Sequence, residues 1–258
     1  MKIALCLKLV PSTTADLRPS ADGKSLQLGG VEMLVNPYDE YALEAALKLR
    51  EAFPGSTILA LTAGGDDAAK CVLQAFSLGV DAAVQIKEPG ISARAAARAV
   101  AAALKDFAPD IVLCGRQAID DDQWEFPGAL GELLNVPHVT AVQALTVEAD
   151  GKKLSCKRRF NRDEQTLEAT LPAVVSCDKG LNDPRSPTLK GRLDAKKKTA
   201  TIKTLAELGL DAAALKFTLS VEKVSPPPQK TPSKTINLPA PEAAREVLRW
   251  LREEAKAI

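Results

Sequence analysis

The feature that most constrains the fold is a regular alternation of short apolar runs with helix-patterned segments along the first half of the chain. Apolar runs at 3–9, 56–61, 82–86 and 111–114 predict buried strands. Helices are predicted to begin at Pro37 behind an Asn36 N-cap, near Asp66, at Ser92 and near Pro127. This alternation indicates an α/β fold, a doubly wound and mostly parallel sheet with helices on both faces.

The pattern changes after Val139. Strand-length runs at 141–148, 154–160, 166–170 and 173–177 predict added antiparallel strands, with Asp150-Gly151 as a hairpin turn. Beyond Gly180 regular spacing is lost, apart from a short helix at 205–208 and a last helix from Pro241. We therefore predict an α/β domain with its antiparallel extension over 1–180, an exposed loop over 181–200, and an extended C-terminal arm over 201–258 that lies against a partner subunit.

Composition excludes several classes of function. A net charge of +1 gives no reason to expect nucleic acid as a partner. No run approaches the roughly 20 apolar residues of a membrane span, and the first residues carry no signal-peptide pattern, so we expect a soluble cytoplasmic protein of a bacterium or archaeon. The five cysteines form no CxxC pair and are expected to be buried thiols. The chain has a single histidine, His138, beside Pro137, which argues against Cys–His and Ser–His catalysis.

The stretch from Asp110 to Gly128 is the best candidate for a binding site. A predicted strand ends at Gly115, a polar loop follows, and a helix restarts where unpaired N–H groups could meet a phosphate. Gly64-Gly65 ends another predicted strand at the same carboxyl edge, but the chain has neither G-x-G-x-x-G nor a P-loop. The three aspartates at 120–122 could bind a divalent metal, act as acid and base, or shape the loop. Loop shaping is favoured, because three adjacent carboxylates cannot all reach one ion and nothing nearby completes a cage.

Several stretches, taken as a set, resemble the beta subunit of electron transfer flavoprotein. They are Lys8-Leu9-Val10-Pro11, Asn36 through Ala42, Gly115 through Asp122, Arg158 with 171–176, and 181–185 running on to 196–198. They occur in order over residues 1 to 200. The resemblance implies an adenine-nucleotide alpha-hydrolase-like fold. It also implies a subunit that carries electrons without bond chemistry of its own, in a heterodimer whose alpha subunit holds FAD.

The resemblance further implies an adenine nucleotide in this subunit, AMP in most members and a second FAD in the electron-bifurcating branch. It implies acyl-CoA or related dehydrogenases and a quinone-linked oxidoreductase as redox partners, with Leu189 matching the leucine that docks a dehydrogenase. Arg158 matches an arginine on the flavin-facing side. The implied nucleotide contacts are Cys6, Asn36, Pro37, Tyr38, Asp39, Ala63, Gly115, Gln117, Asp120, Asp121, Asp122, Gln123, Trp124, Glu125 and Phe126.

One segment departs from the family pattern. After the three aspartates, AMP-binding members typically read x-Asn-Gln-Thr-Gly and bifurcating members read Thr-Ala-Gln-x-Gly, whereas this chain reads Gln123-Trp124-Glu125-Phe126-Pro127-Gly128. The threonine hydroxyl is missing, Pro127 removes a backbone donor, and Glu125 adds negative charge. The ligand of this subunit is therefore left open between AMP and a second FAD.

Two other functions compete with the electron carrier. A stand-alone nucleotide-binding regulator with the same α/β fold would form a homodimer and have no need of the residues after Gly180. An adenylating enzyme would need a phosphate loop with a catalytic lysine or metal ligands, which the sequence lacks.

Overall fold

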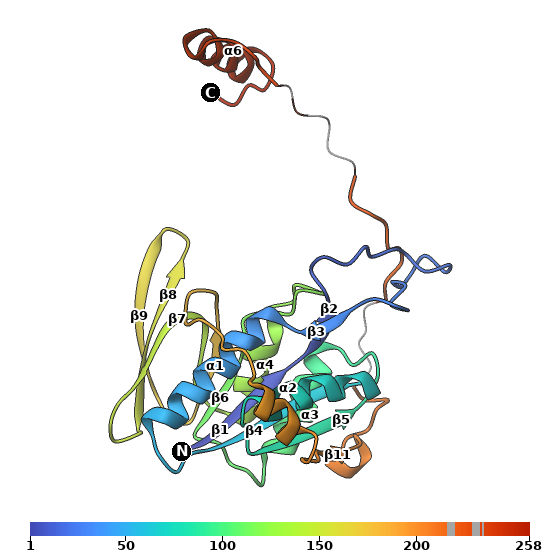
Figure 1. The fold of residues 1–258 in the computed structure, drawn as a ribbon, viewed down its shortest axis with the longest axis vertical. Helices are drawn as coiled ribbons and strands as arrows, with labels where there is room; N and C mark the ends of the chain where they lie inside the picture. The colour runs from blue at the N-terminus through green and yellow to red at the C-terminus, as the bar shows by residue number, and fades with distance from the viewer. Residues whose placement is uncertain (216–219, 229–232, 234) are drawn as a thin grey trace.

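A large mixed sheet forms the centre of the molecule (Figure 1). The computed structural model describes residues 1–215, 220–228, 233 and 235–258. Within these ranges the main sheet has the strand order β11-β5-β4-β1-β6-β10-β7-β8-β9. In that order the strands are Thr201–Lys203, Ala82–Lys87, Thr57–Gly64, Lys2–Leu7, Ile111–Gly115, Ala173–Cys177, His138–Val147, Lys153–Phe160 and Asp163–Thr170.

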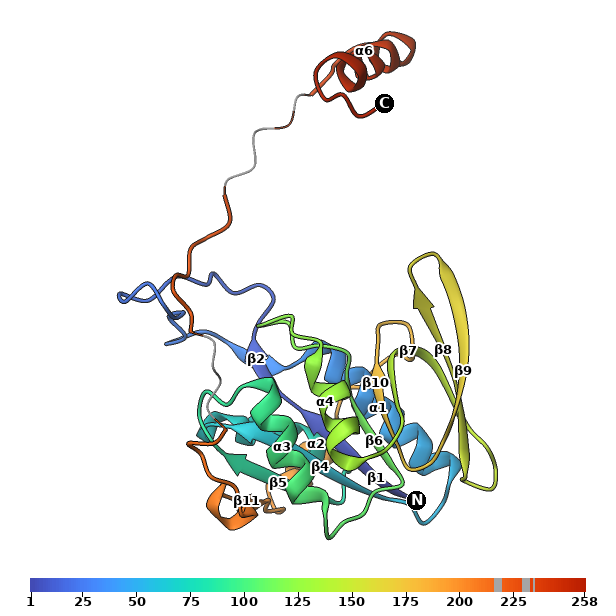
Figure 2. The same cartoon turned by 180° about the vertical axis from the view of Figure 1, so that it is seen from behind.

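Helices cover both faces of this sheet, as Figures 1 and 2 show from opposite sides. Helices α1 (Pro37–Ala52) and α2 (Ala69–Ser77) pack on one face, and α3 (Ala93–Leu104) and α4 (Glu125–Leu134) pack on the other. Strand β1 serves both cores, since Ile3 and Leu5 belong to the first and Ala4 and Cys6 to the second. The predicted doubly wound α/β fold is therefore confirmed.

The strand order reverses direction at β1. The chain winds from β1 through β4 to β5 on one side, then crosses to β6 on the other side of β1. In open parallel sheets such a reversal leaves a crevice at the carboxyl ends of the strands, where ligands bind. The glycine-bearing ends of β4 and β6 meet at this edge, as predicted.

The prediction that Ala173–Cys177 is an antiparallel addition is wrong. This strand, β10, lies between β6 and β7 and runs parallel to both. All five of its residues are buried, which is typical of a central strand in a parallel sheet. Its sequence is therefore a near-continuous apolar run and lacks the alternation of apolar and polar residues that marks a half-exposed antiparallel strand. Strands β8 and β9 are antiparallel, as predicted, and they project from the body as a hairpin (Figure 1).

The first predicted strand is two strands. β1 ends at Leu7, and β2 (Leu9–Pro11) pairs with β3 (Met33–Val35) in a separate small sheet. The break falls at Lys8 because its backbone bonds the start of α1: its N–H donates to Asp39 at 2.7 Å, and its carbonyl accepts from the Asn36 N–H at 2.9 Å. An apolar run in sequence gave no sign of this contact.

The predicted loop over 181–200 contains a helix. Helix α5 (Leu189–Ala195) begins behind Thr188, whose hydroxyl accepts a hydrogen bond from the Gly191 N–H at 3.0 Å. Leu189, predicted to lie in a loop, is therefore the first residue of α5. The predicted arm from 201 begins as the edge strand of the main sheet, because β11 pairs with β5, and the short 3-10 helix η2 (Ala206–Leu208) follows it. A similar short turn, η1 (Asp66–Ala68), precedes α2.

The last helix, α6 (Ala240–Glu253), stands clear of the body in both views (Figures 1 and 2). None of its residues is buried, and Val247, Leu248 and Trp250 are each more than 40% exposed. Within the ranges that the structure describes, none of the helices has the length and apolar composition of a membrane span.

Candidate functional site

A cavity of about 90 Å³ lies where the strand order reverses. The carboxyl ends of β1, β4 and β6 form its floor, and α3 and α4 flank it. Its surface is mostly aliphatic, with Phe126 adding an aromatic ring, and such a surface suits a flat apolar ring. The lining residues are Cys6, Leu7, Lys8, Asn36, Asp39, Leu61, Thr62, Ala63, Ile91, Ala93, Ala96, Val100, Cys114, Gly115, Gln117, Ala118, Asp121, Gln123, Phe126 and Pro127.

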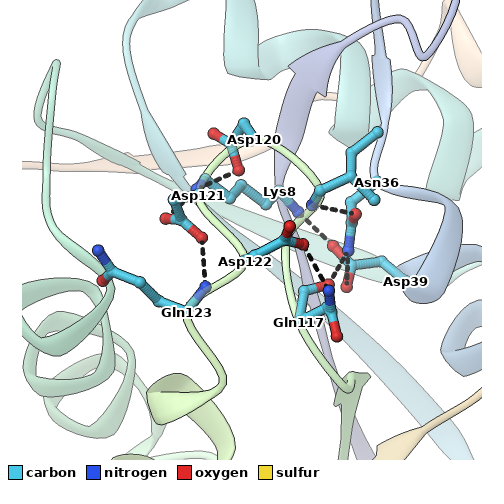
Figure 3. Close-up of polar contacts among 9 residues, drawn as sticks. Lys8, Asn36, Asp39, Gln117, Asp120, Asp121, Asp122 and Gln123 are labelled. Atoms are coloured by element: carbon cyan, nitrogen blue, oxygen red, sulfur yellow. Dashed lines mark hydrogen bonds and ion pairs between the residues drawn. The ribbon is translucent and has the colours of Figure 1, made fainter. Parts of the chain in front are cut away.

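A buried polar network closes one wall of the cavity (Figure 3). The Asn36 side-chain amide donates to Asp39 Oδ1 at 3.0 Å and to the Gln117 carbonyl at 2.9 Å, while Asn36 Oδ1 accepts from the Ile119 N–H at 3.2 Å. Asp39 also accepts from the Gly115 N–H at 2.9 Å. Asn36 does occupy the N-cap position of α1, but its side chain makes no cap bond there. It ties α1 to the loop after β6 instead.

Burial raises the pKa of Asp39 from its ordinary 3.8 to about 7. Hydrogen bonds from Asn36 and from the N–H groups of Lys8 and Gly115 oppose that rise, as does the positive charge of Lys8. The side-chain atoms of Asn36 and Asp39 are thus engaged by the protein itself. They shape the wall of the cavity more than they offer bonds to a ligand.

Lys8 bridges two of the three loop aspartates at the mouth (Figure 3). Its Nζ lies 2.8 Å from Asp120 and 3.0 Å from Asp121, which holds the loop against the end of β1. Burial lowers the pKa of Lys8, but the hydrogen bonds and charges of the two aspartates outweigh burial and raise it overall. Asp121 also accepts the Gln123 N–H at 3.1 Å, and Asp122 accepts from the Gln117 amide. These contacts agree with the loop-shaping interpretation. In the described part of the chain, no group of three or more His, Cys, Asp or Glu side chains is arranged to hold a metal ion.

Helix α4 starts at Glu125, two residues before the predicted start at Pro127. Glu125 is paired with Arg94 of α3, with 3.1 Å between Oε2 and Nη2. Its other oxygen, Oε1, is shielded from water and finds no hydrogen-bond partner within the described ranges. Pro127 lies in the first turn and has no N–H to offer.

Arg116 is held between two aromatic rings outside the cavity. Its guanidinium lies 4.8 Å from the Tyr38 ring centre and 4.3 Å from that of Trp124, and it donates to Asp178 at 2.9 Å. This stack fixes the loop between β6 and α4 at its outer side. Trp124 itself is 49% exposed.

The structure brings together nine of the fifteen nucleotide contacts that the resemblance implies. Cys6, Asn36, Asp39, Ala63, Gly115, Gln117, Asp121, Gln123 and Phe126 line the cavity, whereas Pro37, Tyr38, Asp120, Asp122, Trp124 and Glu125 lie next to it without lining it. Arg158 lies apart on β8, where it bonds Gln165 and Thr140. Leu189 lies on α5, where it is 77% exposed.

Sequence reasoning missed the wall that α3 contributes. Ile91, Ala93, Ala96 and Val100 face the cavity from the segment that begins this helix. In an alanine-rich helix these residues carry no chemical signal, so only the position of α3 over β4 could identify them. Lys8 was noticed within a motif, but its pairing with the aspartates was not predicted.

All five cysteines are buried and unpaired, as predicted. Burial raises the pKa of Cys6 and Cys114, the two that line the cavity, well above the ordinary value for a thiol. They therefore serve as small apolar side chains of the cavity floor.

Comparison with known proteins agrees with this fold. Residues 26–208 match the family model described as the electron transfer flavoprotein domain. The chain belongs to the electron transfer flavoprotein family. It is 32% identical over 257 residues to the electron transfer flavoprotein subunit beta of Syntrophomonas wolfei, which covers 99% of this chain and 98% of that protein. It is 35% identical over 239 residues to the Bacillus subtilis protein of the same name, covering 90% and 91%. The family resemblance stated from the sequence is confirmed.

The residues of the cavity suit one part of an adenine nucleotide better than the other. Its apolar interior fits an adenine ring. The start of α4 does not fit a phosphate, because Pro127 supplies no donor and Glu125 places a carboxylate there.

Proposed function

We propose that this chain is the beta subunit of a heterodimeric cytoplasmic electron carrier. In this proposal FAD is held mainly by the alpha subunit, receives electrons from acyl-CoA or related dehydrogenases, and passes them to a quinone-linked oxidoreductase. The chain does no bond chemistry. It positions the flavin-bearing partner, with Arg158 on the flavin-facing side, and uses its own cavity to hold an adenine ring.

The observation that carries the proposal is that the last helix exposes its apolar side chains. Helix α6 exposes Val247, Leu248 and Trp250 and buries none of its residues against the body. An amphipathic helix of this kind gains little stability alone and usually packs against another chain. We propose the alpha subunit as that partner, since the relatives of this chain are named subunit beta.

Helix α5 supports docking of the redox partner. Leu189 and Leu193, one helical turn apart, are 77% and 53% exposed. The preceding Arg185 makes three bonds to the buried Glu44 and one of 2.7 Å to Glu51, so the approach to α5 is anchored on α1. The leucine pair is thus presented on a fixed support, which lowers the entropic cost of docking.

Reconstitution tests the proposal. The chain would be co-expressed with the alpha subunit, and the purified complex would be mixed with a reduced acyl-CoA dehydrogenase while flavin absorbance is followed. The proposal predicts a complex with bound FAD that the dehydrogenase reduces. A nucleotide-loaded homodimer that ignores the alpha subunit would instead support the stand-alone regulator.

A further inference from the structure

We infer that the cavity of this chain takes a neutral purine nucleoside and rejects the phosphate of AMP. The inference rests on the proposed assignment of the cavity to an adenine ring. It depends on how the residues at the start of α4 would interact with a phosphate at that end of the cavity.

Backbone donors are scarce where the phosphate would lie. The first turn of a helix offers four unpaired N–H groups at most, and Pro127 removes one of them from α4. Just before the helix, the Gln123 N–H is already given to Asp121 at 3.1 Å. A phosphate at this end would find fewer donors than a helix start normally provides.

The local charge is also unfavourable. The segment 120–125 carries four carboxylates, those of Asp120, Asp121, Asp122 and Glu125. Within the described ranges, the cations paired with them are Lys8, which bridges two, and Arg94, which contacts the fourth. Two negative charges remain, and a phosphate monoester brings nearly two more at neutral pH.

Glu125 adds a specific obstacle. Its Oε2 is paired with Arg94, but its Oε1 is shielded from water and has no hydrogen-bond partner in the described part of the chain, so a phosphate nearby would face a carboxylate oxygen that no donor engages. Lys8 already donates two of its three ammonium hydrogens to Asp120 and Asp121, and its positive charge is shared between these two carboxylates. A ligand without charge meets none of these costs.

The rest of the cavity remains suited to a ring. Leu61, Ile91, Val100 and Phe126 supply apolar surface, and the Asn36–Asp39 network is complete without a ligand. The cavity therefore has the apolar surface that an adenine ring needs but lacks the backbone donors and positive charge that a phosphate needs.

The test compares adenosine with AMP on the complex of this chain and its alpha subunit. Nucleosides and nucleotides released by denaturation would be identified, and the ligand-depleted complex would be titrated with each compound by calorimetry. We expect adenosine to bind at least ~10-fold more tightly than AMP, a difference of about 1.4 kcal/mol. AMP present at one per FAD, or bound as tightly as adenosine, would overturn the inference.

Variants supply the reverse test. Glu125→Gln with Pro127→Gly returns two positions to the pattern of AMP-binding members, and AMP affinity should rise at least ~10-fold while adenosine affinity stays nearly constant. Glu125→Gln alone serves if the double variant folds poorly. Glu132→Gln, which removes the same charge from an exposed position of α4, should change neither affinity. An unchanged AMP affinity in both Glu125 variants would contradict the inference.

The outcomes separate this inference from the proposed function. A complex that carries FAD but binds AMP as well as adenosine refutes only the choice of ligand. A chain that forms no flavin-containing complex refutes the proposed function, while its own preference between the two compounds still decides the inference. Failure to bind either compound refutes the assignment of the cavity and the inference together.

Discussion

At the scale of single residues, Asp39 links three parts of the site. Its carboxylate accepts hydrogen bonds from Lys8 at the end of β1, from Asn36 before α1, and from Gly115 at the end of β6. The carboxylate is nearly inaccessible to water. Its three hydrogen bonds stabilise the charged form, while the loss of hydration destabilises that form.

The raised pKa of Asp39 predicts how stability depends on pH. The folded state keeps the proton up to about pH 7, whereas the unfolded chain releases it near 3.8, so the folded state binds more protons between these values. The contribution of Asp39 to the free energy of unfolding should therefore fall as pH rises from 4 to 7. Relative to an Asp39→Asn variant, the wild type should lose on the order of 2–3 kcal/mol between pH 5 and pH 7 in urea unfolding. A difference that is constant with pH would contradict this assignment.

Gly115 predicts a second effect on stability. A Cβ at this position would collide with the Asp39 carboxylate and would come within 2.8 Å of the Tyr38 backbone. Gly115→Ala should destabilise the fold by roughly 1–3 kcal/mol, measured by urea unfolding, because neither neighbour can move freely. Gly29→Ala is the matched control, since nothing lies within 4 Å of its added methyl group. Equal effects of the two substitutions would show that the close approach is unimportant.

At the scale of elements, sequence patterns identified most strands and helices and the antiparallel pairing of β8 with its neighbours, but not the position of every strand in the sheet. The β1, β4, β5 and β6 segments were recognisable because apolar runs alternate with amphipathic helices. The placement of β10 was not, because a fully buried strand carries no directional signal. Helix α5 was missed because seven residues are too few to show a period, and its start depends on the Thr188 cap.

Helix α5 also carries a functional prediction. Leu189→Ala should slow flavin reduction by a dehydrogenase several-fold, as expected when a small apolar anchor is lost, with FAD content unchanged. The measurement is stopped-flow reduction of the purified complex. Leu133→Ala, on the exposed side of α4, is the control and should leave the rate unaltered. Wild-type rates in the Leu189 variant would remove α5 from the docking surface.

At the scale of the whole molecule, many apolar side chains are buried in the body, but those of the last helix are not. The doubly wound body buries two cores of its own, while α6 keeps its apolar side chains outside. The sequence predicted a long arm and the edge of the sheet that holds the cavity. It did not predict the contribution of α3 or the lysine bridge, because both depend on contacts between distant segments.

The most direct test of the account is the composition of the complex formed with the alpha subunit. Native mass spectrometry and flavin quantification of the co-expressed proteins should give one copy of each chain with bound FAD. Trp250→Asp together with Val247→Asp should abolish that complex, because each places a charge on the apolar side of α6, while circular dichroism of the variant stays that of a folded chain. The account would be contradicted if this variant still formed the complex. It would also be contradicted if the wild-type chain were stable and free of flavin without binding the alpha subunit.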